Sequence, residues 1–166
     1  MIEFRTIRAD EGQKLRAIRL QALAESPAAF GSTLAETKAR PVTYWNDRAV
    51  RDSAGTESTL VVAEDENGWV GLTGGYLGNC NGMRSVELIS MWVNPAYRGG
   101  GLAQHLVEQI VAWARQRNAE SVTLWVTQGN TPAVSLYARC GFRNTGETQE
   151  LPSDPSLLEL QMVLDL

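Results

Sequence analysis

The most constraining feature of the sequence is a strand-like segment that runs through a glycine turn into a helix. Residues 86–93, Val-Glu-Leu-Ile-Ser-Met-Trp-Val, are mostly apolar or β-branched and are followed by Asn94-Pro95, which is typical of a buried strand that stops there. Three glycines follow Arg98, and an apolar-periodic helix begins at Leu102. Consecutive glycines lower stability because they lose much backbone entropy on folding. Their presence here is explained if a ligand approaches the main chain closely. Because unpaired N–H groups at a helix N-terminus suit a phosphate, the stretch predicts a pyrophosphate cradle.

The length and composition indicate one domain over residues 1–166. Of the 166 residues, 43% are hydrophobic and 20% are charged, as in globular proteins that bury a core. No apolar run reaches the roughly 20 residues that span a bilayer, and residues 1–8 alternate like a strand rather than a signal peptide. We therefore expect a cytoplasmic protein without a membrane partner. The two cysteines, Cys80 and Cys140, fit a reducing compartment.

The charge pattern argues against two classes of function. The net charge is −4 and no basic block is present, which disfavours nucleic acid as a partner. One histidine and two scattered cysteines offer no zinc-type ligand cluster, so no metal is expected. The acidic balance mildly favours an amine-bearing substrate.

Hydrophobic periodicity divides the chain into strands and helices without repeats or linkers. Helices are predicted at 11–25, 41–51, 102–117 and 131–139, with Asp10 and Thr131 as N-caps. Strands are predicted at 3–9, 59–64, 69–77, 84–93, 121–127, from 142 and at 158–164, with loops at 28–33 and 52–58 and a turn at 78–82. The strand at 121–127 follows a crossover helix and is expected to lie parallel to the strand at 84–93. The pattern predicts an α+β fold with helices on both faces of a mixed, mostly antiparallel sheet.

Two motifs carry a family resemblance. The sequence Arg98-x-x-Gly101-x-Ala103 resembles the acetyl-CoA pyrophosphate motif of the GNAT superfamily of N-acetyltransferases. Asn130-Thr-Pro-Ala-Val-Ser-Leu-Tyr137-Ala-Arg-Cys-Gly-Phe142 resembles the N-x-x-A-x-x-L-Y-x-x-x-G-F signature of that superfamily. The resemblance covers nearly the whole chain. It implies the acyl-CoA N-acyltransferase fold, with six to seven strands and a splayed central strand pair, and direct acetyl transfer from acetyl-CoA to a primary amine.

The resemblance also implies the residues that hold acetyl-CoA. The backbone of residues 91–93 would pair with pantetheine, and the N–H of Met91 would polarise the thioester carbonyl. The cradle for the pyrophosphate would be residues 98–103. The predicted cofactor-binding residues are Met91, Trp92, Val93, Arg98, Gly99, Gly100, Gly101, Leu102, Ala103, Asn130 and Tyr137.

Two residues are catalytic candidates. The resemblance makes Tyr137 the general acid that protonates the departing sulfur, and Glu87, a carboxylate in an otherwise apolar strand, is the candidate base. Each has a structural alternative. Tyr137 is spaced like a core residue of its helix, Glu87 suits an ion pair on a sheet surface, and Asn130 suits a cap or turn.

The sequence leaves the acceptor open among a small-molecule amine, a peptide N-terminus and a lysine. Residues 24–34 and the helix at 41–51 are expected to border it. A non-catalytic acyl-CoA-binding or sensing module is the alternative function. A dinucleotide-dependent oxidoreductase is disfavoured because the glycines do not fit G-x-G-x-x-G. Dimers are common in the superfamily, but the sequence identifies no homodimer interface.

Overall fold

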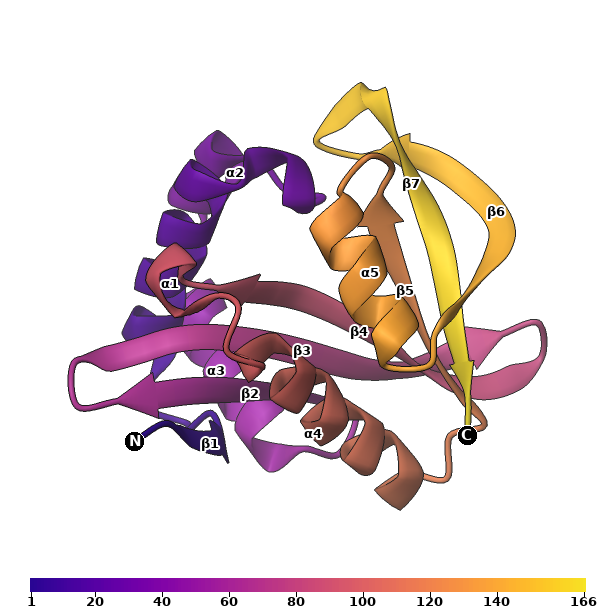
Figure 1. Cartoon of the computed structure of the whole chain (residues 1–166). Helices are drawn as coiled ribbons and strands as arrows, with labels where there is room; N and C mark the ends of the chain where they lie inside the picture. The colour runs from indigo at the N-terminus through magenta and orange to yellow at the C-terminus, as the bar shows by residue number, and fades with distance from the viewer.

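The computed structural model describes residues 1–166 as one seven-stranded sheet with helices on both faces (Figure 1). The strands are β1 (Glu3–Thr6), β2 (Ser58–Asp65), β3 (Gly68–Cys80), β4 (Met83–Val93), β5 (Ser121–Thr127), β6 (Arg143–Leu151) and β7 (Asp154–Asp165). The helices are α1 (Gly12–Glu25), α2 (Leu34–Ala39), α3 (Val42–Ala54), α4 (Leu102–Gln116) and α5 (Thr131–Arg139), with short 3₁₀ turns η1 (Pro27–Ala29) and η2 (Pro95–Tyr97). No helix is long and apolar enough to cross a membrane.

The strand order is β1-β2-β3-β4-β5-β7-β6, and every neighbouring pair is antiparallel except β4 and β5. The predicted parallel pairing after the α4 crossover is therefore confirmed. One core joins α4 to one face of the sheet through Leu106 and Ile110, and a second joins α1 and α3 to the other face through Leu15 and Trp45. The predicted α+β fold with covered faces is confirmed.

The parallel pair separates after three positions. Ser85, Val86 and Glu87 of β4 pair with 121–123 of β5, and no later residue does. Residues 88–93 of β4 therefore present an edge without a strand partner, and the two ribbons diverge in Figure 1. This is the splayed central pair that the family resemblance implies.

A bulge redirects β4 where it leaves β5. The β3–β4 register shifts between Leu72 and Gly74, and Ser90 has a φ of +59°, which few non-glycine residues adopt. Two residues of β4 thus oppose Thr73 alone, and such bulges often re-aim a strand beside an active site. The Gly74-Gly75 pair predicted a bulge or close approach, and a Cβ at Gly74 would lie 3.3 Å from Ile89 Cγ1.

Two predicted caps are wrong. Helix α1 begins after Glu11 rather than Asp10, because the Glu11 carboxylate turns back to Arg5 and to the Arg8 N–H. Helix α5 is capped by Asn130 rather than Thr131, since the Asn130 side chain accepts a hydrogen bond from the Ala133 N–H at 3.4 Å. Glu11 itself makes no side-chain capping hydrogen bond to α1, whereas the cap at Asn130 is the structural alternative that the sequence offered for that residue.

Several predicted boundaries also change, and one helix was missed. Helix α3 continues to Ala54 and ends at Gly55 in the left-handed conformation (φ +66°), so Asp52 is helical and not in a loop. Strands β3 and β4 extend to a tight Asn81-Gly82 turn, which shortens the turn predicted at 78–82. Strand β1 ends at Thr6 rather than at residue 9, and β7 begins at Asp154 rather than at residue 158. Helix α2 was not predicted, although Thr33 and Glu36 form the capping box that marks its start.

Candidate active site

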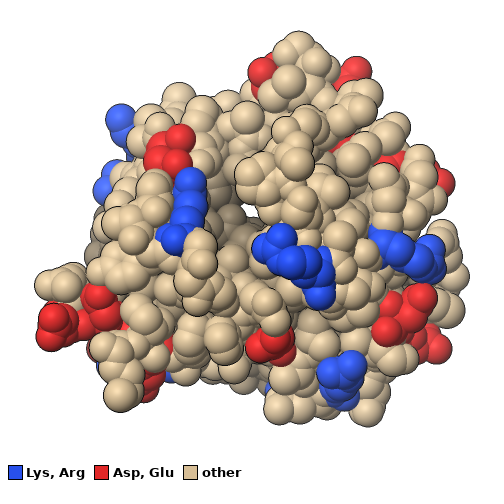
Figure 2. Space-filling view, viewed as in Figure 1, with Lys and Arg blue, Asp and Glu red and all other residues tan.

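The opening between β4 and β5 leads into a cavity of about 890 Å³, here called the glycine-turn cavity. It brings together nine of the predicted cofactor-binding residues: Met91, Trp92, Val93, Arg98, Gly99, Gly101, Leu102, Ala103 and Asn130. Gly100 and Tyr137 are not among its lining residues. Figure 2 shows a hollow at the centre of this face with basic side chains on both sides, and the basic residues that line the cavity are Arg98 and Arg139.

The glycine turn provides open backbone at the start of α4. Gly99 and Gly101 have φ values of +85° and +86°, and Gly101 is the residue before the helix. No atom lies within 4 Å of a Cβ added at Gly99, Gly100 or Gly101. A ligand can therefore reach the main chain there, next to the unpaired N–H groups and positive dipole end of a 15-residue helix. This geometry fits a pyrophosphate.

Arg98 is held by the protein instead of facing a ligand freely. Its Nη atoms donate to the Glu25 carboxylate at 3.1 and 2.8 Å, and its Nε donates to the Val93 carbonyl at 2.9 Å. Trp92 Nε1 donates to the same carboxylate at 2.9 Å. The Arg98 guanidinium lowers the pKa of Glu25 from 4.5 to about 2, with help from Ser26. This clamp ties the end of α1 to the end of β4 and the glycine turn.

Tyr137 lies under the cavity, on the buried side of α5. Its ring is 6% exposed and packs edge-on against Phe142, with 5.8 Å between ring centroids. Its neighbours Ala133 and Leu136 line the cavity. Burial raises the pKa of Tyr137 above its usual value, so the hydroxyl stays protonated at neutral pH. That oxygen has no partner within the chain and is not fully enclosed.

A short segment separates the glycine-turn cavity from a second one. Ser26 to Ala29 line the first cavity, and Ala29 to Ser32 line the second. The segment is fixed across the opening because Thr127 Oγ1 donates to the Ala28 carbonyl at 2.6 Å and Ser153 Oγ donates to the Phe30 carbonyl at 2.5 Å. The loop predicted at 28–33 therefore includes the end of η1 and is hydrogen-bonded to β5 and to the turn before β7.

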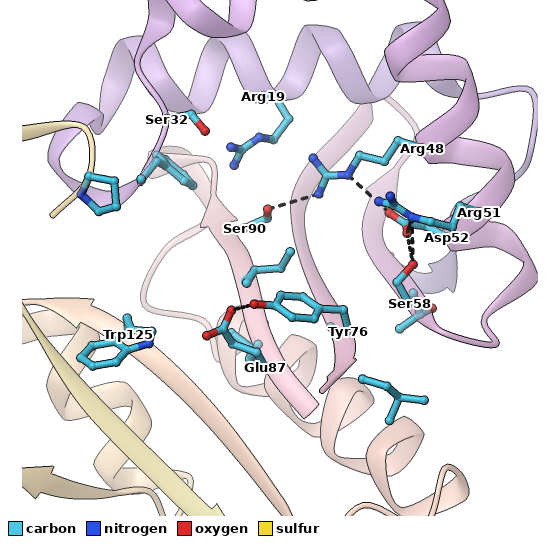
Figure 3. Close-up of a pocket in the computed structure, with 18 of the residues that line it drawn as sticks. Arg19, Ser32, Arg48, Arg51, Asp52, Ser58, Tyr76, Glu87, Ser90 and Trp125 are labelled. Atoms are coloured by element: carbon cyan, nitrogen blue, oxygen red, sulfur yellow. Dashed lines mark hydrogen bonds and ion pairs between the residues drawn. The ribbon is translucent and has the colours of Figure 1, made fainter. Parts of the chain in front are cut away.

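The second cavity has a volume of about 840 Å³ and is here called the arginine cavity (Figure 3). Glu87 lies on its wall and accepts a hydrogen bond from the Tyr76 hydroxyl. Burial and the Glu87 hydrogen bond raise the pKa of Tyr76. Glu87 is also the last residue of β4 that pairs with β5. The candidate base therefore sits at the fork where the two central strands separate.

The other end of the arginine cavity is basic. Arg19 of α1 and Arg48 of α3 are 7% and 9% exposed, and both line the cavity. Asp52, which is 2% exposed, contacts Arg48 Nε and Arg51 Nε and accepts a hydrogen bond from Ser58 at 2.6 Å. The buried Asp52 carboxylate thus contacts two guanidinium groups, whereas the Arg19 guanidinium contacts no carboxylate.

Four site-lining arginines were missed (Arg19, Arg48, Arg51 and Arg139), although the sequence carries signals for three of them. Arg139 is four residues after Ser135, which puts both on the cavity face of α5. Arg19 lies midway between Leu15 and Leu23, on the buried stripe of α1. Arg48 likewise occupies a core-facing position of α3. A charged residue at an apolar position of an amphipathic helix is an informative exception.

No group of histidine, cysteine and acidic side chains is arranged to hold a metal ion. Cys140 keeps its thiol protonated because burial raises its pKa.

The comparisons with known proteins agree with this geometry. A GNAT-family acetyltransferase from Streptococcus pneumoniae superposes with a TM-score of 0.84 at 16% identity over 100% of both chains. A ribosomal-protein-alanine N-acetyltransferase from Brucella melitensis gives 0.76 at 26% identity over 99% of both chains. The PaiA N-acetyltransferase from Thermoplasma acidophilum, solved with coenzyme A, gives 0.78 at 16% identity over 100% of this chain and 99% of its own. No curated protein matches in sequence.

The family model described as the acetyltransferase (GNAT) family matches residues 20–142. This range contains the glycine turn, the splayed strand pair and both sequence motifs. The chain therefore belongs to the acetyltransferase (GNAT) family and is an enzyme of that class.

Proposed function

We propose that this enzyme transfers the acetyl group of acetyl-CoA to a primary amine by direct attack on the thioester. The observation that carries the proposal is the opening between β4 and β5, with the glycine turn at one end and Glu87 at its fork. A cofactor enters from the glycine-turn cavity and an amine from the arginine cavity, and the two meet along the free edge of β4.

The protein binds acetyl-CoA mainly through main-chain groups in this proposal. The N–H groups of residues 99–103 hold the pyrophosphate, and the edge of β4 at 91–93 pairs with pantetheine. The bulge at Ser90 breaks the strand ladder just before Met91, whose N–H stabilises charge that develops on the thioester oxygen. Arg98 organises the turn through Glu25. Asn130 caps α5 and lines the same cavity.

Two side chains move protons. The amine nitrogen forms a bond to the acetyl carbon as the carbon–sulfur bond breaks. Glu87 accepts the amine proton, directly or through water, and Tyr137 donates its proton to the departing sulfur. Because its pKa is raised, the Tyr137 hydroxyl stays protonated at neutral pH and can donate its proton. No covalent enzyme intermediate is needed because the amine itself is the nucleophile.

A panel of amines with acetyl-CoA tests the function, with free thiol as the rate readout and mass spectrometry of the acetylated product as confirmation. The panel covers small amines, amino acids, peptide N-termini and lysine peptides. Saturable turnover with at least one amine is expected. Saturable acetyl-CoA binding without turnover of any amine would instead support the acyl-CoA-binding module.

A further inference from the structure

The arginine cavity contains a buried cation without a partner. Arg19 is 7% exposed, and none of its guanidinium nitrogens donates a hydrogen bond within the chain. Its Nε and Nη1 atoms are fully enclosed, whereas Nη2 is not, and the residue lines the cavity. Buried charged groups normally have partners. The exception here faces a space large enough for a small ligand.

A second arginine faces the same space and is weakly held. Arg48 contacts Asp52 and the Ser90 hydroxyl, each at 3.4 Å, which is long for a hydrogen bond. Asp52 also contacts Arg51 Nε at 3.3 Å, so this buried carboxylate is shared between two guanidinium groups and no ion pair reaches Arg19. Figure 3 shows Arg19 and Arg48 reaching from α1 and α3 toward the same region beside Ser90.

The positive charges of Arg19 and Arg48 repel each other when no anion lies between them. Burial and the nearby charge of Arg48 lower the pKa of Arg19 to about 10, so Arg19 still carries its charge at neutral pH. The Phe30 ring lies 4.7 Å from the guanidinium carbon and stabilises the cation through its face. That ring offers no hydrogen-bond acceptor to the three nitrogens.

Carboxylates line other parts of the cavity. Glu87 lies at the fork of the central strands beside Tyr76, and Glu159 lies on β7 opposite Thr127, 9% exposed, with Gln149 donating to it at 2.7 Å. One cavity therefore contains two buried guanidinium groups, on α1 and α3, and separate carboxylates, among them Glu57 and Glu87. A ligand that fits it carries charges of both signs.

We propose that the acceptor is a small amine that also carries an oxyanion, a carboxylate or a phosphonate, held by Arg19 and Arg48 while its amine points to Glu87. The amine end of this assignment rests on the proposed function. The anion end stands on the unpartnered guanidinium groups. Planar guanidinium groups bind such oxyanions in bidentate geometry. Amino acids and short peptides with a free carboxylate fit this description, whereas polyamines do not.

Matched acceptors test the charge requirement. Thiol release with acetyl-CoA is measured for L-leucine, L-phenylalanine and glycylglycine, each against its carboxamide, and for the aminophosphonate analogue of leucine. We expect kcat/KM to be at least about 10-fold higher with the oxyanion, the net value of a charge-assisted hydrogen bond. The phosphonate separates a general oxyanion site from one restricted to carboxylates. Equal rates for acids and carboxamides would overturn the proposal.

Variants test the assigned residue. Arg19→Met should raise KM for the carboxylate acceptors by about 10- to 100-fold and should alter KM for acetyl-CoA and kcat/KM for the matched carboxamides by much less. Arg16→Met is the matched control, because Arg16 lies on the same helix and lines neither cavity. Equal loss with acids and carboxamides in Arg19→Met would make the role structural and contradict the proposal.

A binding measurement separates this proposal from the proposed function. Calorimetric titration with the same acids and carboxamides needs no turnover. Binding that requires the oxyanion and disappears in Arg19→Met supports the anion site even if no amine is acetylated. If amines without an oxyanion are turned over best, acetyl transfer stands and the anion site is refuted. If acids neither bind nor react, the anion site is refuted as well.

Discussion

The two cavities both border strand β4, but different parts of the chain line them. The glycine-turn cavity is lined by the continuous segment 91–104 with its open glycine backbone, together with residues 26–29, 127–130 and helix α5. The arginine cavity is lined by side chains from α1, α3, β3, β4 and β5. In the proposed function, acetyl-CoA is thus bound mainly by a local motif, whereas the acceptor is bound by side chains brought together from distant parts of the chain.

The largest effect is expected from a substitution of Tyr137, which tests whether the glycine-turn side of the site also supplies the general acid. Tyr137→Phe keeps the ring packed on Phe142 and removes only the proton donor. We expect kcat to fall by about 100-fold or more, with the acetyl-CoA dissociation constant within about twofold of wild type. Steady-state kinetics and calorimetry measure both, and a melting curve checks folding. Unchanged turnover would remove Tyr137 as the acid.

The next largest effect is expected from a substitution of Glu87, which tests the proposed base in the arginine cavity. Glu87→Gln should lower kcat/KM for the amine by about 10- to 100-fold, because it removes the carboxylate that accepts the amine proton. Tyr76→Phe is its control, because it removes the hydrogen bond to Glu87 and keeps the carboxylate. A kcat/KM of Glu87→Gln equal to that of wild type in steady-state kinetics would leave Glu87 as a structural residue.

A pair of glycine substitutions tests how local the cofactor cavity is. Gly101 has a φ of +86° while Gly100 is not in the left-handed region, so an alanine at Gly101 is strained by about 1 kcal/mol or more. Gly101→Ala should lower the free energy of unfolding by that amount and weaken acetyl-CoA binding. Gly100→Ala should leave stability within about 0.5 kcal/mol. Equal denaturation midpoints for the two would show that the turn does not depend on the Gly101 conformation.

The smallest expected effect concerns the clamp that Glu25 forms with Arg98 and Trp92. Glu25→Gln removes the charge that holds Arg98 and Trp92, and we expect a KM for acetyl-CoA that rises a few-fold with little change in kcat. Glu25 has its pKa lowered from 4.5 to about 2. Its contribution to stability is therefore present above pH 4.5 and is lost as the pH falls toward 2. Denaturation curves of wild type and Glu25→Gln should converge at the acidic end. A constant difference across that range would contradict the clamp.

The cofactor side could be predicted from the sequence because its determinants are neighbours in the chain. A buried strand, a proline stop, glycines and an amphipathic helix follow one another between 86 and 117. The structure places nine of the predicted cofactor residues in one cavity. The misplaced caps at Asp10 and Thr131 show the limit of this reasoning. Which of two adjacent polar residues caps a helix depends on partners such as Arg5 that lie outside the helix.

The sequence by itself determined the order of the strands and of every helix except α2, the parallel step from β4 to β5 and the glycine turn, because periodicity and turn residues act over short distances. Only the tertiary structure decided the arginine cavity. Arg19 and Arg48 are 29 positions apart in the sequence and meet because α1 and α3 pack on the same face of the sheet. The net charge of −4 gave no sign of a basic pocket, since a whole-chain sum does not report how burial concentrates charge locally.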